Sequence, residues 1–104
     1  MKKYKVFVHG QNFLLNLNGK AEKLGFYTTR FVEADDEREA GEIAISALRN
    51  DPTLCGGVLN ENFDAPMLYV EDIAELDSFE GLTVPGTGLS FYAETRPDIQ
   101  HTVL

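Results

Sequence analysis

The 104-residue chain lacks tryptophan and has a single cysteine, Cys55. One cysteine excludes a disulfide within the chain, which fits the reducing cytoplasm. It also excludes a structural zinc site of the common type, because His9 and His101 raise the number of such ligands to three at most. We therefore expect a cytoplasmic domain that is held together by its apolar core, without a metal or another cofactor.

The sequence has no apolar run close to the roughly 18 residues that a membrane span needs. Its basic start, MKKYKVFVHG, has neither a long apolar stretch nor a small-residue cleavage site, so no signal peptide is predicted. The phosphate-binding loop and the Gly-x-Ser-x-Gly elbow are also missing. These absences argue against a membrane protein, a P-loop nucleotide-binding protein and a serine hydrolase.

Basic residues are scarce, and most of them lie near the start of the chain. The net charge is −8, although residues 1–32 sum to +5 and residues 33–104 to −13. Such asymmetry is typical either of basic and acidic strands that pair within one sheet, or of a charged binding face. The net charge argues against nucleic-acid binding, which would require Lys3, Lys5, Lys20, Lys23 and Arg30 to share one exposed face, without acids from 71–80 among them.

Alternation of apolar and polar residues predicts strands over 4–9, 13–17 and 24–34. Asn18-Gly19 is a strong turn signal, so the N-terminal third is a hairpin or a three-stranded meander with a loop at about 18–23. The inward-facing positions are even before the polar residues 9–12 and odd after them. One extra residue must therefore be absorbed there, and Gly10 is the expected bulge or corner.

The segment EADDEREAGEIAISALRNDP predicts a helix over about 36–50. Asp36 and Glu39 have the spacing of a capping box, and Pro52 follows the helix end. Gly41 lies beside the apolar stripe and should cost about 1 kcal/mol relative to alanine. The stripe has helical spacing and consists of Ala40, Ile43, Ala44, Ala47 and Leu48.

The second half of the chain contains less regular signals. Residues 50–66 form a long loop, with Val58-Leu59 as a short strand inside it. Residues 67–76 predict a strand with a bulge near Glu71-Asp72. Its inward-facing residues are Leu68, Val70, Ile73 and Leu76. Residues 81–88 form a loop, 89–94 a short edge strand, and 95–104 a loose tail.

These elements predict a single α+β domain over 1–94. An antiparallel sheet of four or five strands, in the order β-β-(β)-α-β-β, carries the helix on one face. The chain has many aromatic residues, and one alanine-rich helix cannot cover them all. Either the loop 50–66 or a second copy of the chain covers the other sheet face. The aromatic residues in question are Phe7, Phe13, Tyr27, Phe31, Phe63, Tyr69, Phe79, Phe91 and Tyr92.

Three functions follow from these features. The first is a non-catalytic binding module, a homodimer that self-associates through the aromatic sheet face. The second is a small enzyme or ligand-binding protein with a pocket near residues 9–12, the loop 55–62 and the turn 86–88. A general base needs an orienting partner, and Cys55 has no basic neighbour within five positions to activate its thiol, so binding is favoured over catalysis. The candidate binding residues are His9, Gln11, Asn12, Cys55 and Asn60.

The third function is binding of nucleic acid or of a toxin partner through the basic N-terminal hairpin. The segment VEADDEREA, in which a strand leads into an acidic helix start, resembles part of the partial RNase H-like fold of HicB-type antitoxins. This resemblance implies a protein partner of the toxin class. The long segment after the helix departs from the family pattern, and the resemblance assigns no functional residue.

Overall fold

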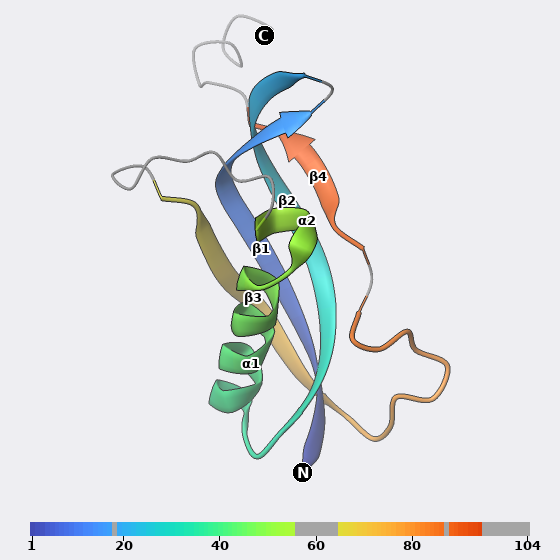
Figure 1. The fold of residues 1–104 in the computed structure, drawn as a ribbon. Coiled ribbons are helices and arrows are strands. Elements are labelled where there is room, and N and C mark those ends of the chain that lie inside the picture. The colour runs from blue at the N-terminus through green and yellow to red at the C-terminus, as the bar shows by residue number, and fades with distance from the viewer. Residues whose placement is uncertain (18, 56–64, 87, 95–104) are drawn as a thin grey trace, which may run out of the picture.

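The chain forms four strands and two helices, in a computed structural model that describes residues 1–17, 19–55, 65–86 and 88–94. The strands make one antiparallel sheet in the order β3-β1-β2-β4, and the helices lie on one of its faces (Figure 1). This arrangement confirms the predicted α+β class. Of the four or five strands predicted, the described residues form four. Val58-Leu59, Asn60 and the tail 95–104 lie outside the described residues. The elements are β1 (Lys2–Leu17), β2 (Lys20–Ala34), α1 (Glu37–Arg49), α2 (Pro52–Cys55), β3 (Met67–Leu76) and β4 (Ser90–Ala93).

β1 and β2 form a long hairpin that is interrupted by one bulge. Gly10 lies opposite Phe26 and Phe13 lies opposite Leu24, so Gln11 and Asn12 together face a single residue of β2. Such a bulge shifts the alternation by one position. The predicted change of parity is thereby confirmed. The loop expected at about 18–23 is shorter than predicted, because β2 already begins at Lys20.

Asn12, rather than Gly10, adopts the unusual backbone conformation at this bulge, with a φ of 62°. Asparagine tolerates this left-handed region because its short polar side chain can form local hydrogen bonds. Gly10 instead makes room for a neighbouring side chain, because a Cβ atom at this position would overlap the ring of Phe26. The bend was therefore predicted in the right place, but the residue assigned to it was wrong.

The N-terminus of α1 is capped by reciprocal hydrogen bonds. The backbone N–H of Glu39 donates to Asp36 Oδ1 (2.8 Å), as the capping box predicts. The Glu39 carboxylate in turn accepts from the backbone N–H of Asp35 (3.0 Å), one residue earlier than in the standard motif. Two of the N–H groups around the helix start are therefore satisfied by side chains.

The buried side of α1 is rotated relative to the predicted stripe. Ala40, Gly41, Ala44 and Leu48 are buried, whereas Ile43 is 38% exposed. Ala47 is also exposed. The reason is that α1 packs against β3 as well as against the hairpin, and Gly41 lies on the side next to β3.

The strand β3 contains the predicted bulge. Phe7 lies opposite Asp72 and Val8 lies opposite Val70, which leaves Glu71 as the extra residue. Leu68 and Ile73 pack against the core as expected. Leu76, however, lies opposite Lys3 on the other face of the sheet. This assignment was wrong because Leu76 follows Ile73 by three positions, an odd number that reverses the side-chain direction in a strand.

The core lies between the sheet and the helices. It also includes Leu54 of α2, a short helix within the segment 50–66 that was predicted as a loop, so α2 lies on the helix side of the sheet. The largest fully buried side chains are Tyr4, Val6, Val8, Phe26 and Leu48. Neither described helix has the length and the apolar run that crossing a membrane would require.

The sheet face away from α1 is called the open face below. Its described residues include Lys3, Lys5, Phe7, His9, Gly25, Tyr27, Thr29, Phe31, Glu33, Tyr69, Glu71, Asp72, Ala74, Leu76, Ser90 and Tyr92. The connection from β3 to β4 covers part of this face near the chain start (Figure 1). There the Phe79 ring lies 6.1 Å from Phe31, and the Phe31 N–H donates to the Pro85 carbonyl oxygen (2.8 Å).

Candidate functional site

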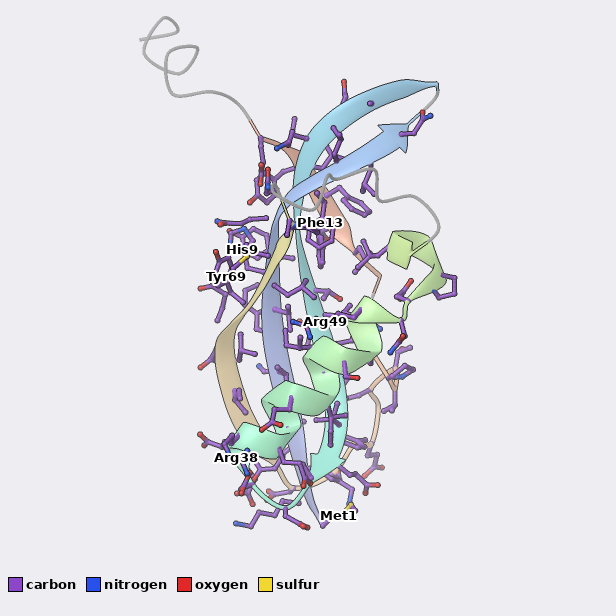
Figure 2. All side chains as sticks on the ribbon, turned by 60° about the vertical axis from the view of Figure 1, so that its left-hand side comes forward. Met1, His9, Phe13, Arg38, Arg49 and Tyr69 are labelled. Carbon is purple, nitrogen blue, oxygen red and sulfur yellow. The ribbon has the colours of Figure 1, made fainter. Side chains whose placement is uncertain are left out.

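His9 lies at the centre of the open face, surrounded by side chains from the other three strands. Its imidazole stacks on the Tyr27 ring, with centroids 4.3 Å apart and planes at 14°. His9 Nε2 is 2.5 Å from the Tyr92 hydroxyl, and Nδ1 is 3.2 Å from Glu71 Oε1. Figure 2 shows His9 and Tyr69 together on the side of the sheet away from α1. The five residues of this site, called the His9 cluster below, are His9, Tyr27, Tyr69, Glu71 and Tyr92.

Tyr92 reaches His9 because β2 has a glycine between them. Tyr92 on β4 lies opposite Gly25 on β2. A Cβ atom on Gly25 would overlap the Tyr92 ring. Without that atom the ring can lie over β2, so that its hydroxyl group meets the imidazole on β1. A glycine inside a strand commonly marks such a close approach.

Glu71 enters the cluster through the bulge in β3. As the extra residue between Val70 and Asp72, it has no direct partner on β1. Bulges change the direction in which a side chain points, and here the Glu71 carboxylate is within hydrogen-bond distance of His9. The bulge therefore brings a second polar group to His9 without interrupting the row of aromatic side chains on the face.

The Tyr92 hydroxyl of the cluster lies in an environment that favours its protonated form. Burial raises the pKa of the Tyr92 hydroxyl, and the neighbouring Tyr27 and Glu94 raise it further. The Tyr92 hydroxyl and one Glu71 carboxyl oxygen each lie within hydrogen-bond distance of a different ring nitrogen of His9. Both ring nitrogens of His9 therefore have a polar neighbour, and the residue is only 8% exposed.

The rings of the cluster form an exposed aromatic surface. Tyr27 is 38% exposed and Tyr69 is 40% exposed, although their neighbour His9 is only 8% exposed. Phe7 extends the row, because its ring stacks on Tyr27 with centroids 5.5 Å apart and planes at 6°. Tyr27 also stacks on Tyr92 at 5.7 Å. His9 therefore contacts, through its ring, two aromatic side chains that solvent can reach.

Asn12, the second predicted binding residue, belongs to a different set of contacts. Its backbone N–H donates to Glu94 Oε2 (2.7 Å), and its side-chain oxygen accepts from Lys23 Nζ (2.5 Å). Its amide nitrogen donates to the carbonyl oxygen of Ala65 (3.3 Å). Asn12 thus connects the bulge of β1 to the end of β4 and to the segment before β3.

The other predicted binding residues are spread over the molecule. Gln11 is partly buried in the bulge, opposite Met67. Cys55 ends α2 on the helix side of the sheet, whereas His9 lies on the open face. Asn60 is outside the described residues. Of the predicted turn 86–88, Gly86 bridges to Arg30 on β2. Of the predicted site residues that the structure describes, only His9 therefore has a cluster of aromatic and acidic neighbours.

Sequence reasoning missed the four partners of His9. Glu71 and Tyr92 lie 62 and 83 residues from it along the chain, so no local pattern connects them. One signal was present: Gly25 interrupts an aromatic and β-branched strand, which indicates a close approach by another group.

The basic residues of the hairpin do not gather on one surface. Lys3 and Lys5 are on the open face, whereas Arg30 is on the helix face, 3.7 Å from Asp51. Asp72 and Lys5 are also on the same face. The condition stated for a nucleic-acid surface is therefore not met. In the described ranges, no three His, Cys, Asp or Glu side chains come together in a way that could hold a metal ion.

A shallow groove runs along the other side of the sheet, between α1 and β3. Its apolar residues are Gly41, Ile45, Val70 and Ile73. The Arg38–Glu42 ion pair (2.6 Å) lines the same groove. None of the predicted site residues and no member of the His9 cluster lines it.

Comparisons with protein-family models, with curated proteins and with solved structures find no match for this chain. The resemblance to HicB-type antitoxins receives no further support, and the geometry of the open face carries the functional argument.

Proposed function

We propose that this protein is a non-catalytic binding module that self-associates through the open face of its sheet. The observation that carries this proposal is the exposure of Tyr27 and Tyr69 beside a histidine whose two nitrogens are already occupied. Large aromatic rings that are held rigidly at a surface are typical of protein interfaces, because they bury much apolar area at a small cost in conformational entropy. The exposed rings of Tyr27 and Tyr69 support binding, whereas His9, at 8% exposure, is little accessible to a substrate.

Among the residues that the structure describes, the connection between β3 and β4 covers one part of the open face. The connection between β3 and β4 places Phe79 near Phe31, which is buried. Tyr27 and Tyr69 lie further along the strands, opposite and beside His9, and stay exposed. The part of the face that the described residues leave exposed therefore carries the His9 cluster, and a second copy would bury it.

Charge favours a second copy as the partner at this surface. An acidic protein of net charge −8 repels its own copies unless they meet through a nearly neutral patch. The open face is such a patch, because two lysines balance most of three acids. These charged residues are Lys3, Lys5, Glu33, Glu71 and Asp72.

Sedimentation equilibrium across the micromolar range tests this function. The unmodified protein should be a dimer, and a Tyr27→Ser, Tyr69→Ser double variant should be a monomer with an unchanged far-UV circular dichroism spectrum. Ile43→Ser on α1 is the matched control, since Ile43 is as exposed as Tyr27 (both 38%) but lies on the other side of the sheet. Ile43→Ser should leave the dimer intact. An unmodified protein that stays monomeric at the highest concentration would overturn the proposal.

A further inference from the structure

Two exposed charges on the open face have no partner among the residues that the structure describes. Lys5 on β1 and Asp72 on β3 form no ion pair or side-chain hydrogen bond there. The other charges on this face are engaged. Lys3 Nζ is 3.5 Å from Glu33, and Glu71 contacts His9. Lys5 and Asp72 are therefore the two charges that are available to a partner.

These two residues flank the aromatic row. Asp72 lies directly opposite Phe7, and Lys5 precedes Phe7 by two positions on the same face of β1. The cation and the carboxylate are thus diagonal neighbours on adjacent strands, a spacing of roughly 7–8 Å between backbones. Both residues are exposed and have no partner among the described residues, so each side chain can extend outward toward a second molecule.

In a contact with two-fold symmetry, every pair occurs twice. If one residue of the first copy contacts a second residue of the other copy, the second residue of the first copy contacts the first residue of the other. We propose that Lys5 of one copy pairs with Asp72 of the other copy, and Asp72 with Lys5, so that two equivalent ion pairs flank the stacked rings. This inference rests on the proposed self-association and adds its register. Flat aromatic surfaces specify orientation poorly, whereas complementary charges fix it and penalise the alternatives.

Charge reversal tests the register, with the dimer dissociation constant from sedimentation equilibrium as the readout. Lys5→Asp and Asp72→Lys should each place like charges against each other and raise the dissociation constant at least about tenfold. The Lys5→Asp, Asp72→Lys double variant should return it to within about threefold of the original value, because the pair is restored with its signs exchanged.

Glu42→Lys on α1 is the matched control, since it changes the net charge as much as Asp72→Lys does, at an exposed site on the other side of the sheet. It should leave the dissociation constant within about twofold. Asp72→Asn offers a milder variant and should weaken the dimer less than Asp72→Lys does.

The outcomes separate this inference from the proposed function. If the Tyr27→Ser, Tyr69→Ser variant dissociates while both charge reversals leave the dimer unchanged, the ion pair is refuted and the function stands. If the single reversals weaken the dimer and the double variant is weaker still, the pairing is refuted as well. If the unmodified protein never dimerises, both proposals fall together.

Discussion

Replacing Gly41 by alanine should stabilise the fold. Gly41 is buried in the interior of α1, where glycine is less favourable than alanine by about 1 kcal/mol. An added Cβ would lie 3.5 Å from Val70 Cγ2 and 3.6 Å from Ile73 Cδ1, which are ordinary van der Waals distances. The methyl group therefore fits without displacing β3. We expect the free energy of unfolding to rise by about 1 kcal/mol, in part because the unfolded chain loses freedom.

Urea unfolding followed by far-UV circular dichroism measures this gain. The midpoint should increase while the slope stays constant, and the melting temperature should rise by about 4–8 °C. Protein concentrations must be equal, because the proposed self-association would also stabilise the folded state. Gly10→Ala is the contrasting variant, since its Cβ would overlap the Phe26 ring and should lower the midpoint. A lower midpoint for Gly41→Ala would refute the reasoning and show that α1 needs glycine to approach β3.

Three further changes test the cluster and the helix start. Tyr92→Phe removes the hydrogen bond to His9 Nε2 and should lower the free energy of unfolding by about 0.5–1.5 kcal/mol. Urea unfolding measures this loss, and an unchanged midpoint would mean that the hydrogen bond makes no net contribution to stability. Burial raises the pKa of both Tyr4 and Tyr92 above 10.0, so the folded state keeps protons that the unfolded state releases. Stability should therefore be independent of these groups below pH 10 and fall above it, and the fall should be smaller in Tyr92→Phe; equal pH profiles would contradict this. Asp36→Ala removes the acceptor for the Glu39 N–H and should cost about 1 kcal/mol, seen as a lower melting temperature, with exposed Asp77→Ala as the control that stays unchanged.

The features that could be predicted from the sequence depend on neighbours along the chain. Asp36 and Glu39 are three residues apart, so the pattern contains the whole cap. The two bulges are also visible locally, because the alternation of apolar residues changes parity around Asn12 and around Glu71. Strand type and helix limits follow from the same short-range periodicity.

The features that could not be predicted depend on packing between distant segments. The buried side of α1 turned toward Gly41 because β3 lies beside it, and no residue within the helix indicates that neighbour. Similarly, glycine was expected to absorb the bend in β1. Gly10 is instead needed to make room for Phe26, and Asn12 accepts the left-handed backbone. The His9 cluster joins four strands, so it exists only once the sheet is assembled.

The position of Tyr92 over Gly25 has a consequence for the timing of assembly. β4 is the last described strand to leave the ribosome, and until it docks, His9 lacks the hydroxyl group that orders it. A chain still in synthesis carries Phe7, His9 and Tyr27 without the ring that crosses β2. The open face, which we propose as the self-association surface, is therefore completed only when the last described strand docks.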